Sequence, residues 1–339
     1  MATGLFSPLS LRFAHVPFTK KGIQSNQKFF RLLKSQYPNK MAQVTVSDNT
    51  LVEKSKQLAP ALVGGKHKGQ AGRIGVFGGS VEFTGAPYFS SISALKVGAD
   101  LSYVFTIKDA AFVIKSYSPE LMVLPFLDDQ DAIQKITPWI ERLHVALIGP
   151  GLGRLESTQK VFEAVVNLCR SKQIPLLIDA DGLIFVSKNP DIIKNYPRPV
   201  ILTPNKMEFR KIIGDDVNAN DPKVEQARKF LERVGPNVTL FCKDMVDEII
   251  TLGNSIQISG GGSGRRCGGQ GDMLGGSMST FLVWALEKNW EPAVACYAAS
   301  KLTRDCNARG FQKYGRSMVV TDMIHEIPEI FKENFELRV

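Results

Sequence analysis

Short runs of β-forming residues alternate with segments of helical length from about residue 70 onward. A strand, a helix and a second strand in succession form a right-handed crossover, so the alternation predicts an α/β fold with a mainly parallel central sheet and helices on both faces. The predicted strands of this region are Arg73–Phe77, Ala99–Thr106, Leu121–Leu124, Val145–Gly149, Pro175–Asp179 and Val200–Thr203. The predicted helices are Pro87–Val97, Asp131–Arg142, Ser157–Lys172, Met273–Lys288, Pro292–Arg309 and Asp322–Asn334.

Three further predicted strands follow one another without room for a helix between them. They are Val238–Lys243, Glu248–Leu252 and Ser255–Ser259. Strands spaced this closely favour an antiparallel hairpin region at one edge of the sheet. The body of the chain shows neither an internal repeat nor a Pro/Ser-rich linker, so we expect one single domain over residues 46–339.

The first 45 residues differ in charge from the rest of the chain. Residues 1–40 contain seven Lys and Arg and neither Asp nor Glu, so they hold seven of the nine net positive charges. The remaining body is nearly neutral, which argues against a nucleic-acid-binding face. A basic, Ser-containing leader without acids is typical of organelle transit peptides, and we expect mitochondrial import. The alternatives are a disordered basic tail without an address and a cytoplasmic form that starts at Met41.

Cysteine and histidine usage limits the metal and redox chemistry. The five cysteines are scattered, odd in number and form no C-x-x-C pair, which indicates a reducing compartment without a disulfide framework or a zinc site. The four histidines argue against a His-based metal cluster. No apolar run approaches the roughly 18 residues of a membrane span.

The densest glycine stretch is Gly260–Ser277, in which nine of eighteen residues are glycine. Glycines let backbone N–H groups converge on a ligand, and a helix N-terminus adds partial positive charge at the same point. Arg265 and Arg266 supply the fixed charge that phosphate recognition requires. Asp272 lies inside this anion cradle, where it can accept a proton from a hydroxyl while the cradle holds a phosphoryl group. The alternative is a flexible loop in which Asp272 caps a helix.

Several motifs of ligand-binding type follow the predicted strands. Because ligands of open α/β sheets bind at the carboxyl ends of the strands, we expect these motifs to meet at one edge. They are Gly78-Gly79, Gly149–Gly153, Asp179 with Asp181, Asn205 with Glu208, and Lys243.

Each of these motifs also has a structural interpretation. The segment Gly149–Arg154 can be a tight turn, a close approach to a phosphate or sugar, or part of a hydride-transferring dinucleotide site. Asp179 and Asp181 suit Mg²⁺-bound water or a hydroxyl, but Asp-Gly is also a common turn pair. The segment Asn205–Glu208 has the capping-box spacing, alone or together with contacts to substrate and a metal-bound water. Lys243 can reach a nucleotide phosphate or lie in a solvated hairpin turn.

Nine motifs occur in order between about Lys66 and Ile327: HKGQAGRIGVFGG, FTGAPYFSSISALKVGADLSYVFT, YSPEL, GPGLGR, IDADGL, LTPNKMEF, RRCGGQGD, LTRDCN and GRS. In this order they resemble the eukaryotic ATP-dependent (S)-NAD(P)H-hydrate dehydratases, a family of the ribokinase-like superfamily. The resemblance implies a ribokinase-like fold, a mostly parallel sheet sandwiched by helices, which agrees with the pattern of predicted strands and helices. The leader lies outside it.

The resemblance implies a lyase that repairs damaged NADH and NADPH. These substrates carry water across the C5=C6 bond of the nicotinamide ring. ATP would phosphorylate the C6 hydroxyl, and phosphate, a better leaving group than hydroxide, would then depart with help from the lone pair of the ring nitrogen. The family's activity also implies Mg²⁺ with ATP and a functional link to an NAD(P)H-hydrate epimerase, and it leaves a homo-oligomer open.

The resemblance also gives individual residues a role by their position in the motifs. Asp272 would be the catalytic base, and Gly268, Gly269 and Gly271 would stabilise the transferring phosphoryl group. The hydrate would contact Gly153, Asn205, Lys206, Met207, Glu208, Phe209, Arg210, Lys211 and Asp272. ATP would contact Lys243, Asp244, Met245, Val246, Asp247, Gly262, Ser263, Gly264, Arg265, Arg266, Cys267, Gly268, Gly269, Gln270 and Gly271. No metal ligand is assigned.

The chain departs from the family pattern at two places. The family often has Lys-Gly-x-x-Asp where this chain has Lys243-Asp244-Met-Val-Asp247, so a close backbone approach to ATP near Asp244 is open. The run GDMLGGS replaces the more usual GDLLSGS, and Gly275 costs about 1 kcal/mol relative to Ala inside a helix.

Two other function classes compete with the dehydratase. A small-molecule hydroxyl kinase of the same superfamily would release a phosphorylated product that persists. A non-catalytic nucleotide-binding protein would bind ATP without turnover, and the intact Gly-Gly-Gln-Gly-Asp run argues against it.

Overall fold

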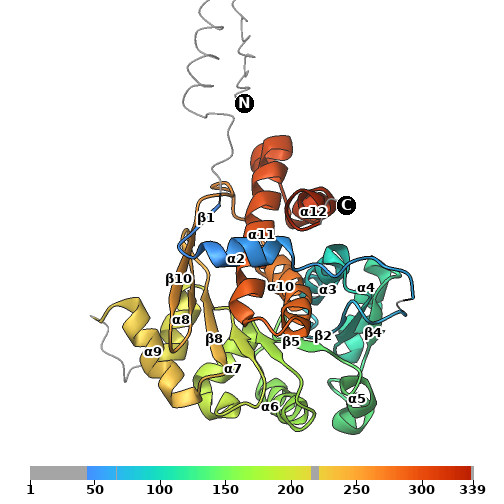
Figure 1. Cartoon of the computed structure of the whole chain (residues 1–339). Coiled ribbons are helices and arrows are strands. Elements are labelled where there is room, and N and C mark those ends of the chain that lie inside the picture. Colours follow the sequence, from blue (N-terminus) through green and yellow to red (C-terminus); the bar gives the residue numbers. More distant parts are fainter. Residues whose placement is uncertain (1–43, 66, 215–220, 337–339) are drawn as a thin grey trace, which may run out of the picture. The chain divides into compact units, whose positions relative to one another are not determined.

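The computed structural model describes residues 44–65, 67–214 and 221–336. The predicted leader, residues 1–45, therefore lies almost entirely outside the described residues, as does Lys66 at the start of the first motif region. The described residues form one α/β domain in which helices cover both faces of a single sheet, as predicted (Figure 1).

The sheet formed by the described residues has ten strands in the order β1-β10-β9-β8-β7-β6-β5-β2-β3-β4. The strands are β1 (Thr45–Val46), β2 (Arg73–Phe77), β3 (Leu101–Phe105), β4 (Met122–Leu124), β5 (Val145–Ile148), β6 (Leu176–Ile178), β7 (Val200–Leu202), β8 (Val238–Cys242), β9 (Asp247–Ile250) and β10 (Ser255–Ser259). The strands from β4 to β8 in this order are parallel. Strands β8, β9, β10 and β1 pair antiparallel, which confirms the predicted hairpin region at one edge.

The described helices are α2 (Asn49–Lys56), α3 (Gly85–Val97), α4 (Lys108–Tyr117), α5 (Ala132–Ile140), α6 (Glu156–Ser171), α7 (Asp181–Lys188), α8 (Lys206–Ile213), α9 (Lys223–Val234), α10 (Gln270–Glu287), α11 (Pro292–Tyr314) and α12 (Val320–Asn334), with short 3-10 helices at Pro190–Ile193 and Gly315–Ser317. Two large buried clusters cover the two faces of the sheet. On β5, Leu147 belongs to the cluster under α3 and α10 to α12, whereas the next residue, Ile148, belongs to the cluster under α5 to α9. This alternation is what a parallel strand buried on both faces requires.

Helix α10 packs unusually close to α3, and glycine makes the approach possible. A Cβ at Gly276 would lie 1.9 Å from the carbonyl oxygen of Ser90, so no larger residue fits there without displacing α3. The neighbouring Gly275 faces the sheet, where a Cβ would lie 3.5 Å from Leu147. Close packing on both sides fixes where the N-terminal end of α10, with Asp272, meets the edge of the sheet.

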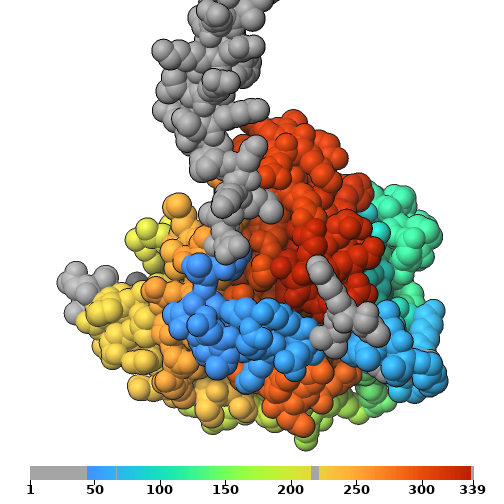
Figure 2. Space-filling model, turned by 45° about the horizontal axis from the view of Figure 1, so that its top comes forward, coloured from blue at the N-terminus to red at the C-terminus, as the bar shows by residue number. Residues whose placement is uncertain are grey.

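The N-terminal described segment lies on the surface beside the C-terminal helices (Figure 2). Asp48 caps α2 by accepting from the backbone N–H of Thr50 at 2.9 Å. Leu51 and Leu58 are buried in the cluster of α10 and α11, and Lys54 pairs with Glu291 at the start of α11 at 2.8 Å. Among the described helices, none is both long and apolar enough to cross a membrane.

Candidate active site

The strand-end motifs meet at one edge of the sheet, as predicted from the parallel topology. Asp179 directly follows β6, and the backbone of Lys243, after β8, bridges that of Asn205, after β7. The N–H of Lys243 donates to the carbonyl of Pro204 at 2.8 Å. On the other side, the N–H of Gly79 donates to the carbonyl of Pro150 at 3.0 Å, which joins the two glycine turns.

A charged cluster lies at the centre of this edge. The Lys243 ammonium Nζ is 2.7 Å from Asp179 Oδ1 and 3.9 Å from Glu208 Oε2. Burial disfavours the ammonium charge, but Asp179 and Glu208 outweigh burial and raise the pKa of Lys243. Burial also raises the pKa of Glu208, although Lys243 opposes that shift. The ammonium is therefore fixed within a group of carboxylates and stays charged.

Asp272 is the third residue of α10 and lies against this cluster. A Cβ on its neighbour Gly271 would lie 3.7 Å from Lys243 Nζ and 3.8 Å from Asp179 Oδ2, so the start of the helix contacts the ion pair. Burial, and then the negative charge of Asp179, raise the pKa of Asp272 from 3.8 to about 8, against the opposing effect of Lys243. A carboxylate with such a pKa is a strong base near neutral pH, as a general base requires.

The N-terminus of α10 has the geometry of an anion site. Gly269 is the N-cap residue with φ of 88°, a left-handed conformation that glycine adopts without strain. A Cβ there would lie 2.7 Å from Val320 and 2.9 Å from Phe89. The N–H groups of the first helical turn have no partner within the helix and carry partial positive charge. The predicted cradle of Gly268, Gly269 and Gly271 therefore has the donors for a phosphoryl group.

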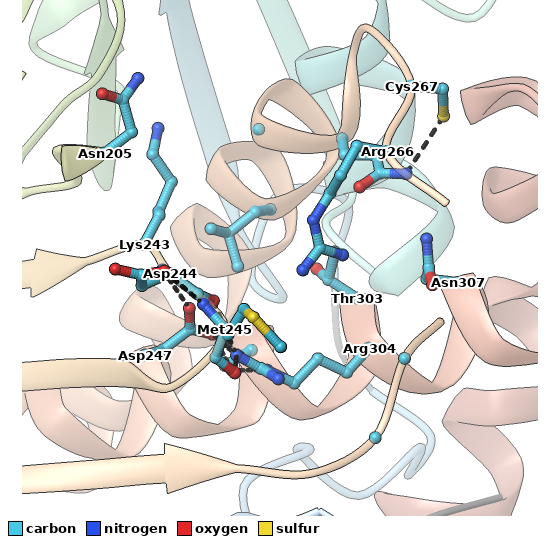
Figure 3. A pocket seen from close by; sticks show the side chains of 16 residues that line it. Asn205, Lys243, Asp244, Met245, Asp247, Arg266, Cys267, Thr303, Arg304 and Asn307 are labelled. Atoms are coloured by element: carbon cyan, nitrogen blue, oxygen red, sulfur yellow. Dashed lines mark hydrogen bonds and ion pairs between the residues drawn. The ribbon is translucent and has the colours of Figure 1, made fainter. Parts of the chain in front are cut away.

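A cavity of about 460 Å³ adjoins the start of α10 (Figure 3). Its size lies within the range of about 300–1,000 Å³ that small-molecule sites occupy. The lining residues are Asn205, Lys243, Asp244, Met245, Asp247, Gly261, Gly262, Arg266, Cys267, Gln270, Gly271, Leu274, Ser300, Thr303, Arg304 and Asn307. Asp272 is not among them, although its neighbour Gly271 is.

The cavity gathers most of the residues predicted to contact ATP, although they come from two distant segments. Those that line it are Lys243, Asp244, Met245, Asp247, Gly262, Arg266, Cys267, Gln270 and Gly271. The predicted residues that do not line it are Val246, Ser263, Gly264, Arg265, Gly268 and Gly269. Asp244 has no positive φ and donates its N–H to Asp247 Oδ1 at 3.0 Å, so this turn forms without the family's glycine.

The adjacent arginines have different surroundings. Arg266 lines the cavity. Arg265 instead donates from Nε to the carbonyl of Met318 at 3.2 Å and from Nη1 to the carbonyl of Arg266 at 2.7 Å. The N–H of Ser263 donates to Asn307 Oδ1 at 2.6 Å. Arg265 and Ser263 therefore hold the loop in place, and Arg266 is the arginine of the pair that lines the cavity.

One wall of the cavity was missed by the sequence analysis. It consists of Ser300, Thr303, Arg304 and Asn307, which lie on one face of α11. Their spacing of i, i+3, i+4 and i+7 is the helical repeat, and this polar stripe beside the apolar residues of the same helix is the signal that could have found them.

Some residues of the predicted hydrate-binding segment on α8 stabilise the helix or pack in the core, and the others are exposed to solvent. Asn205 Oδ1 accepts from the N–H groups of Met207 and Glu208 at 2.9 and 3.0 Å, and Glu208 accepts from the N–H of Asn205 at 2.8 Å. The capping box is thus formed. Phe209 is only 6% exposed and packs in the core, so its side chain is not placed to touch a ligand. The exposed residues of the segment are Asn205, Lys206, Met207, Arg210 and Lys211.

The second acid of the Asp179–Asp181 pair is bound to the neighbouring glycine turn. Asp181 accepts from the N–H of Gly153 at 3.0 Å and from Arg154 Nε at 2.7 Å. Gly149 turns tightly at the same place, since a Cβ would lie 1.9 Å from the carbonyl oxygen of Asp179. Among the described residues, no three His, Cys, Asp or Glu side chains are grouped to hold a metal ion.

Comparisons with known proteins agree with this fold. Residues 74–329 match the NAD(P)H-hydrate dehydratase family. The ATP-dependent (S)-NAD(P)H-hydrate dehydratase of Aedes aegypti is 50% identical over 300 residues, which cover 86% of this chain and 88% of that protein. A ribokinase-like superfamily protein from Enterococcus faecalis has a TM-score of 0.71 at 23% identity, with 85% of this chain and 95% of that one covered. The ADP/ATP-dependent NAD(P)H-hydrate dehydratase of Bacillus subtilis, crystallised with ATP and Mg²⁺, has a TM-score of 0.63 at 22% identity, with 81% and 94% covered. The predicted ribokinase-like fold is confirmed.

Proposed function

The chain belongs to the NAD(P)H-hydrate dehydratase family, and on this premise we propose that it uses ATP to dehydrate the S form of hydrated NADH and NADPH. The reaction restores the reduced nucleotide and makes the protein a lyase of nicotinamide nucleotide repair. The observation that carries the proposal is the position of Asp272, a partly buried acid with a raised pKa in the first turn of α10, beside the charged cluster of Lys243, Asp179 and Glu208.

The residues around Asp272 fit the chemistry that the substrate needs. Asp272 accepts the proton of the C6 hydroxyl as that oxygen bonds to phosphorus. ATP supplies the phosphoryl group that turns the hydroxyl into a leaving group. The N–H groups at the start of α10 stabilise the negative charge of the phosphoryl group during transfer. The phosphate then leaves C6, a proton is lost from C5, and the C5=C6 double bond forms again.

Lys243 links the base to the nucleotide cavity. Its ammonium lines the cavity and is held by Asp179, so it lies beside the helix N-terminus where phosphate oxygens would bind. Its positive charge lowers the pKa of Asp272 and so limits the shift that burial and Asp179 produce. We propose that Lys243 contacts a phosphate of ATP, with Arg266 on the opposite loop.

We also propose that Mg²⁺ accompanies ATP. Since no group of three acidic, His or Cys side chains is placed to hold a metal among the described residues, the phosphates and water would supply most of the ligands, as is usual for Mg²⁺. We propose that the partly buried carboxylate of Glu208, 3.9 Å from Lys243, accepts from a metal-bound water. The Bacillus subtilis neighbour was crystallised with ATP and Mg²⁺.

The experiment that tests the function follows the recovery of dihydronicotinamide absorbance from hydrated NADPH with ATP. Asp272→Asn keeps the size of the side chain but removes the base, and we expect loss of turnover by about 10²–10⁴-fold, the typical contribution of general base catalysis. Asp109→Asn is the matched control, because Asp109 is also an acid in the first turn of a helix but is exposed on α4. Full activity in the Asp272 variant would remove Asp272 as the base.

Two partner expectations belong to the same proposal. An enzyme that acts on one epimer of the hydrate requires an epimerase to convert the other, so adding an NAD(P)H-hydrate epimerase should allow complete consumption of a mixed hydrate. The second expectation is a homo-oligomer. Light scattering would then give a molar mass that is a multiple of 37.4 kDa, and the mass of a monomer would reject the expectation.

For location, we propose that residues 1–45 direct mitochondrial import, with a cytoplasmic form starting at Met41. The support is the acid-free basic composition of the segment. A fusion of residues 1–45 to a fluorescent reporter tests it, with a matched fusion in which the seven Lys and Arg are replaced by Gln. Mitochondrial signal from the first fusion alone is expected, and diffuse signal from both would overturn it.

A further inference from the structure

One guanidinium contacts two neighbouring loops that both line the nucleotide cavity. Arg304, on α11, donates from Nη1 to the carbonyl of Gly260 at 2.8 Å. Its Nη2 donates to the carbonyls of Asp244 at 3.2 Å and Met245 at 3.1 Å. Figure 3 shows the side chain extending from α11 to the turn that contains Met245 and Asp247. The loop before β9 and the loop after β10 lie side by side, because Asp247 pairs with Ile258 in the sheet, and Arg304 adds a side-chain link between their carbonyls.

Asp247 is the counter-ion of Arg304 in this arrangement. Its Oδ2 forms an ion pair with Arg304 Nη2 at 2.9 Å and accepts from Arg304 Nε at 3.0 Å and from Ser300 Oγ at 2.7 Å. Its Oδ1 accepts from the N–H of Asp244 at 3.0 Å. The Arg304 and Asp247 side chains are only 12% and 10% exposed. A buried pair with its hydrogen bonds satisfied is stable, but removing one partner leaves a buried charge without compensation.

Both loops need contacts that hold them in one conformation. Gly260, Gly261 and Gly262 have φ values of 74°, 65° and 69°, and glycine loses more conformational freedom on ordering than any other residue. In the 243–247 turn, Met245 is 78% exposed. The packing is close at α11, where a Cβ at Gly261 would lie 3.2 Å from Arg304 Cβ. Loops of this kind keep one shape only when a rigid element holds them.

We propose that Arg304 is a positioning residue for ATP: it fixes the 243–247 turn and the 260–262 loop in the conformation that the nucleotide requires. Most of its N–H donors are used by the protein, so it acts through the two loops and not by binding phosphate. The inference rests on the proposed function only in taking ATP as the ligand of the cavity. Arg304 should then control ATP affinity and leave the chemical step at Asp272 intact.

The test compares Arg304→Met with Arg309→Met. Arg309 is a matched control because it lies on the same helix and pairs with Glu333 at 2.6 Å, outside the cavity. We expect Arg304→Met to raise the KM for ATP, and the Kd of a non-hydrolysable ATP analogue, by about 10–100-fold, as the loss of charged hydrogen bonds predicts. At saturating ATP, kcat and the KM for the hydrate should change by less than about 3-fold. Unchanged ATP affinity, or an equal loss in all parameters, would overturn the inference.

Two further variants keep the test decisive if Arg304→Met folds poorly. Arg304→Lys keeps the charge beside Asp247 but lacks the planar fork that reaches both loops, so ATP affinity should be intermediate. In the double variant Arg304→Met/Asp247→Asn the buried carboxylate is neutralised, so thermal stability should exceed that of Arg304→Met while ATP affinity stays low. Wild-type ATP affinity in either variant would reject the role of Arg304.

The binding titration separates this inference from the proposed function. It needs no turnover, so a wild-type protein that binds the analogue but leaves the hydrate unchanged would refute the dehydratase activity and still test Arg304. The opposite outcome is also distinguishable. If the wild type dehydrates the hydrate but Arg304→Met binds the analogue as tightly as the wild type does, only the role of Arg304 is refuted.

Discussion

Replacing Asp272 with Asn is expected to stop catalysis and to stabilise the fold as the pH rises. The Asp272 carboxyl has a pKa raised from 3.8 to about 8, mainly by burial and then by Asp179. The folded protein therefore binds this proton more tightly than the unfolded chain does, and the free energy of unfolding falls as the pH rises from about 4 to about 8. Asn cannot titrate and has the shape of the protonated acid, so the variant does not lose this free energy.

The magnitude follows from the shift. Each pKa unit corresponds to about 1.4 kcal/mol, so the four units between 3.8 and about 8 set an upper limit of about 6 kcal/mol for the stability gained above pH 8. The difference between the variant and the wild type should be near zero at about pH 4. It should grow by about 1–1.4 kcal/mol per pH unit through neutrality and level off above about pH 8.

The assay is urea unfolding of both proteins at a series of pH values, with the free energy extrapolated to water. Asp109→Asn, an exposed first-turn acid on α4, controls for the loss of a carboxylate near a helix N-terminus. A stability difference between the Asp272 variant and the wild type that stays constant with pH, or that falls as the pH rises, would refute the argument that Asp272 is held protonated by burial. If Asp272→Asn is more stable than the wild type but has lost turnover, the wild-type carboxylate lowers the stability of the fold and is needed for catalysis.

The remaining predictions concern the same site. The kcat/KM for the hydrate should rise with pH through a limb near pH 8, the pKa of Asp272 in the free protein, and a profile that is flat from about pH 6 to 9 would contradict the base assignment. Asp179→Asn removes the like charge beside Asp272, so its pKa should fall and the same limb should move to lower pH, whereas an unmoved limb would mean that Asp179 does not act on the base. Gly276→Ala forces α10 away from Ser90, so we expect about 1–3 kcal/mol of destabilisation in urea unfolding, whereas Gly253→Ala, where no atom lies within 4 Å of the added Cβ, should not destabilise by crowding. Chelation with EDTA should abolish activity and added Mg²⁺ should restore it, and activity that survives chelation would contradict the need for a divalent cation.

The sheet and its binding edge were readable from the sequence because they depend on local patterns. Strands β2 and β10 have the predicted bounds, since each is a short β-forming run ended by polar or glycine residues. The parallel order then places Asp179, Asn205 and Lys243 at one edge whatever the details of packing. The sequence analysis placed the start of α10 at residue 273, three residues late. Glycine has a low helix propensity, so the glycines at 268, 269 and 271 gave no sign of a helical turn at this point. The correction places Asp272 inside the first turn, among the free N–H groups.

What the sequence could not provide depends on contacts between distant residues. No local pattern couples Arg304 to Asp247, which lies 57 residues earlier, or distinguishes Arg265 from Arg266. Among the described helices, α2, α4, α7 and α9 were not predicted, and α8 was indicated only by its capping box. Helix α9 buries Ala227, Phe230, Leu231 and Val234, whose spacing was a readable helical signal, whereas α7 begins at an Asp-Gly pair that is equally typical of a turn.

The reaction itself provides the most direct test of the account. Purified protein is mixed with hydrated NADPH and either ATP or ADP, and NADPH and free phosphate are measured in the same sample. The account predicts that NADPH appears with ATP and that one phosphate is released for each NADPH formed. A phosphorylated hydrate that persists, or ATP consumption without NADPH, would contradict it and favour a kinase, and NADPH formation without a nucleotide would remove the role of the cavity.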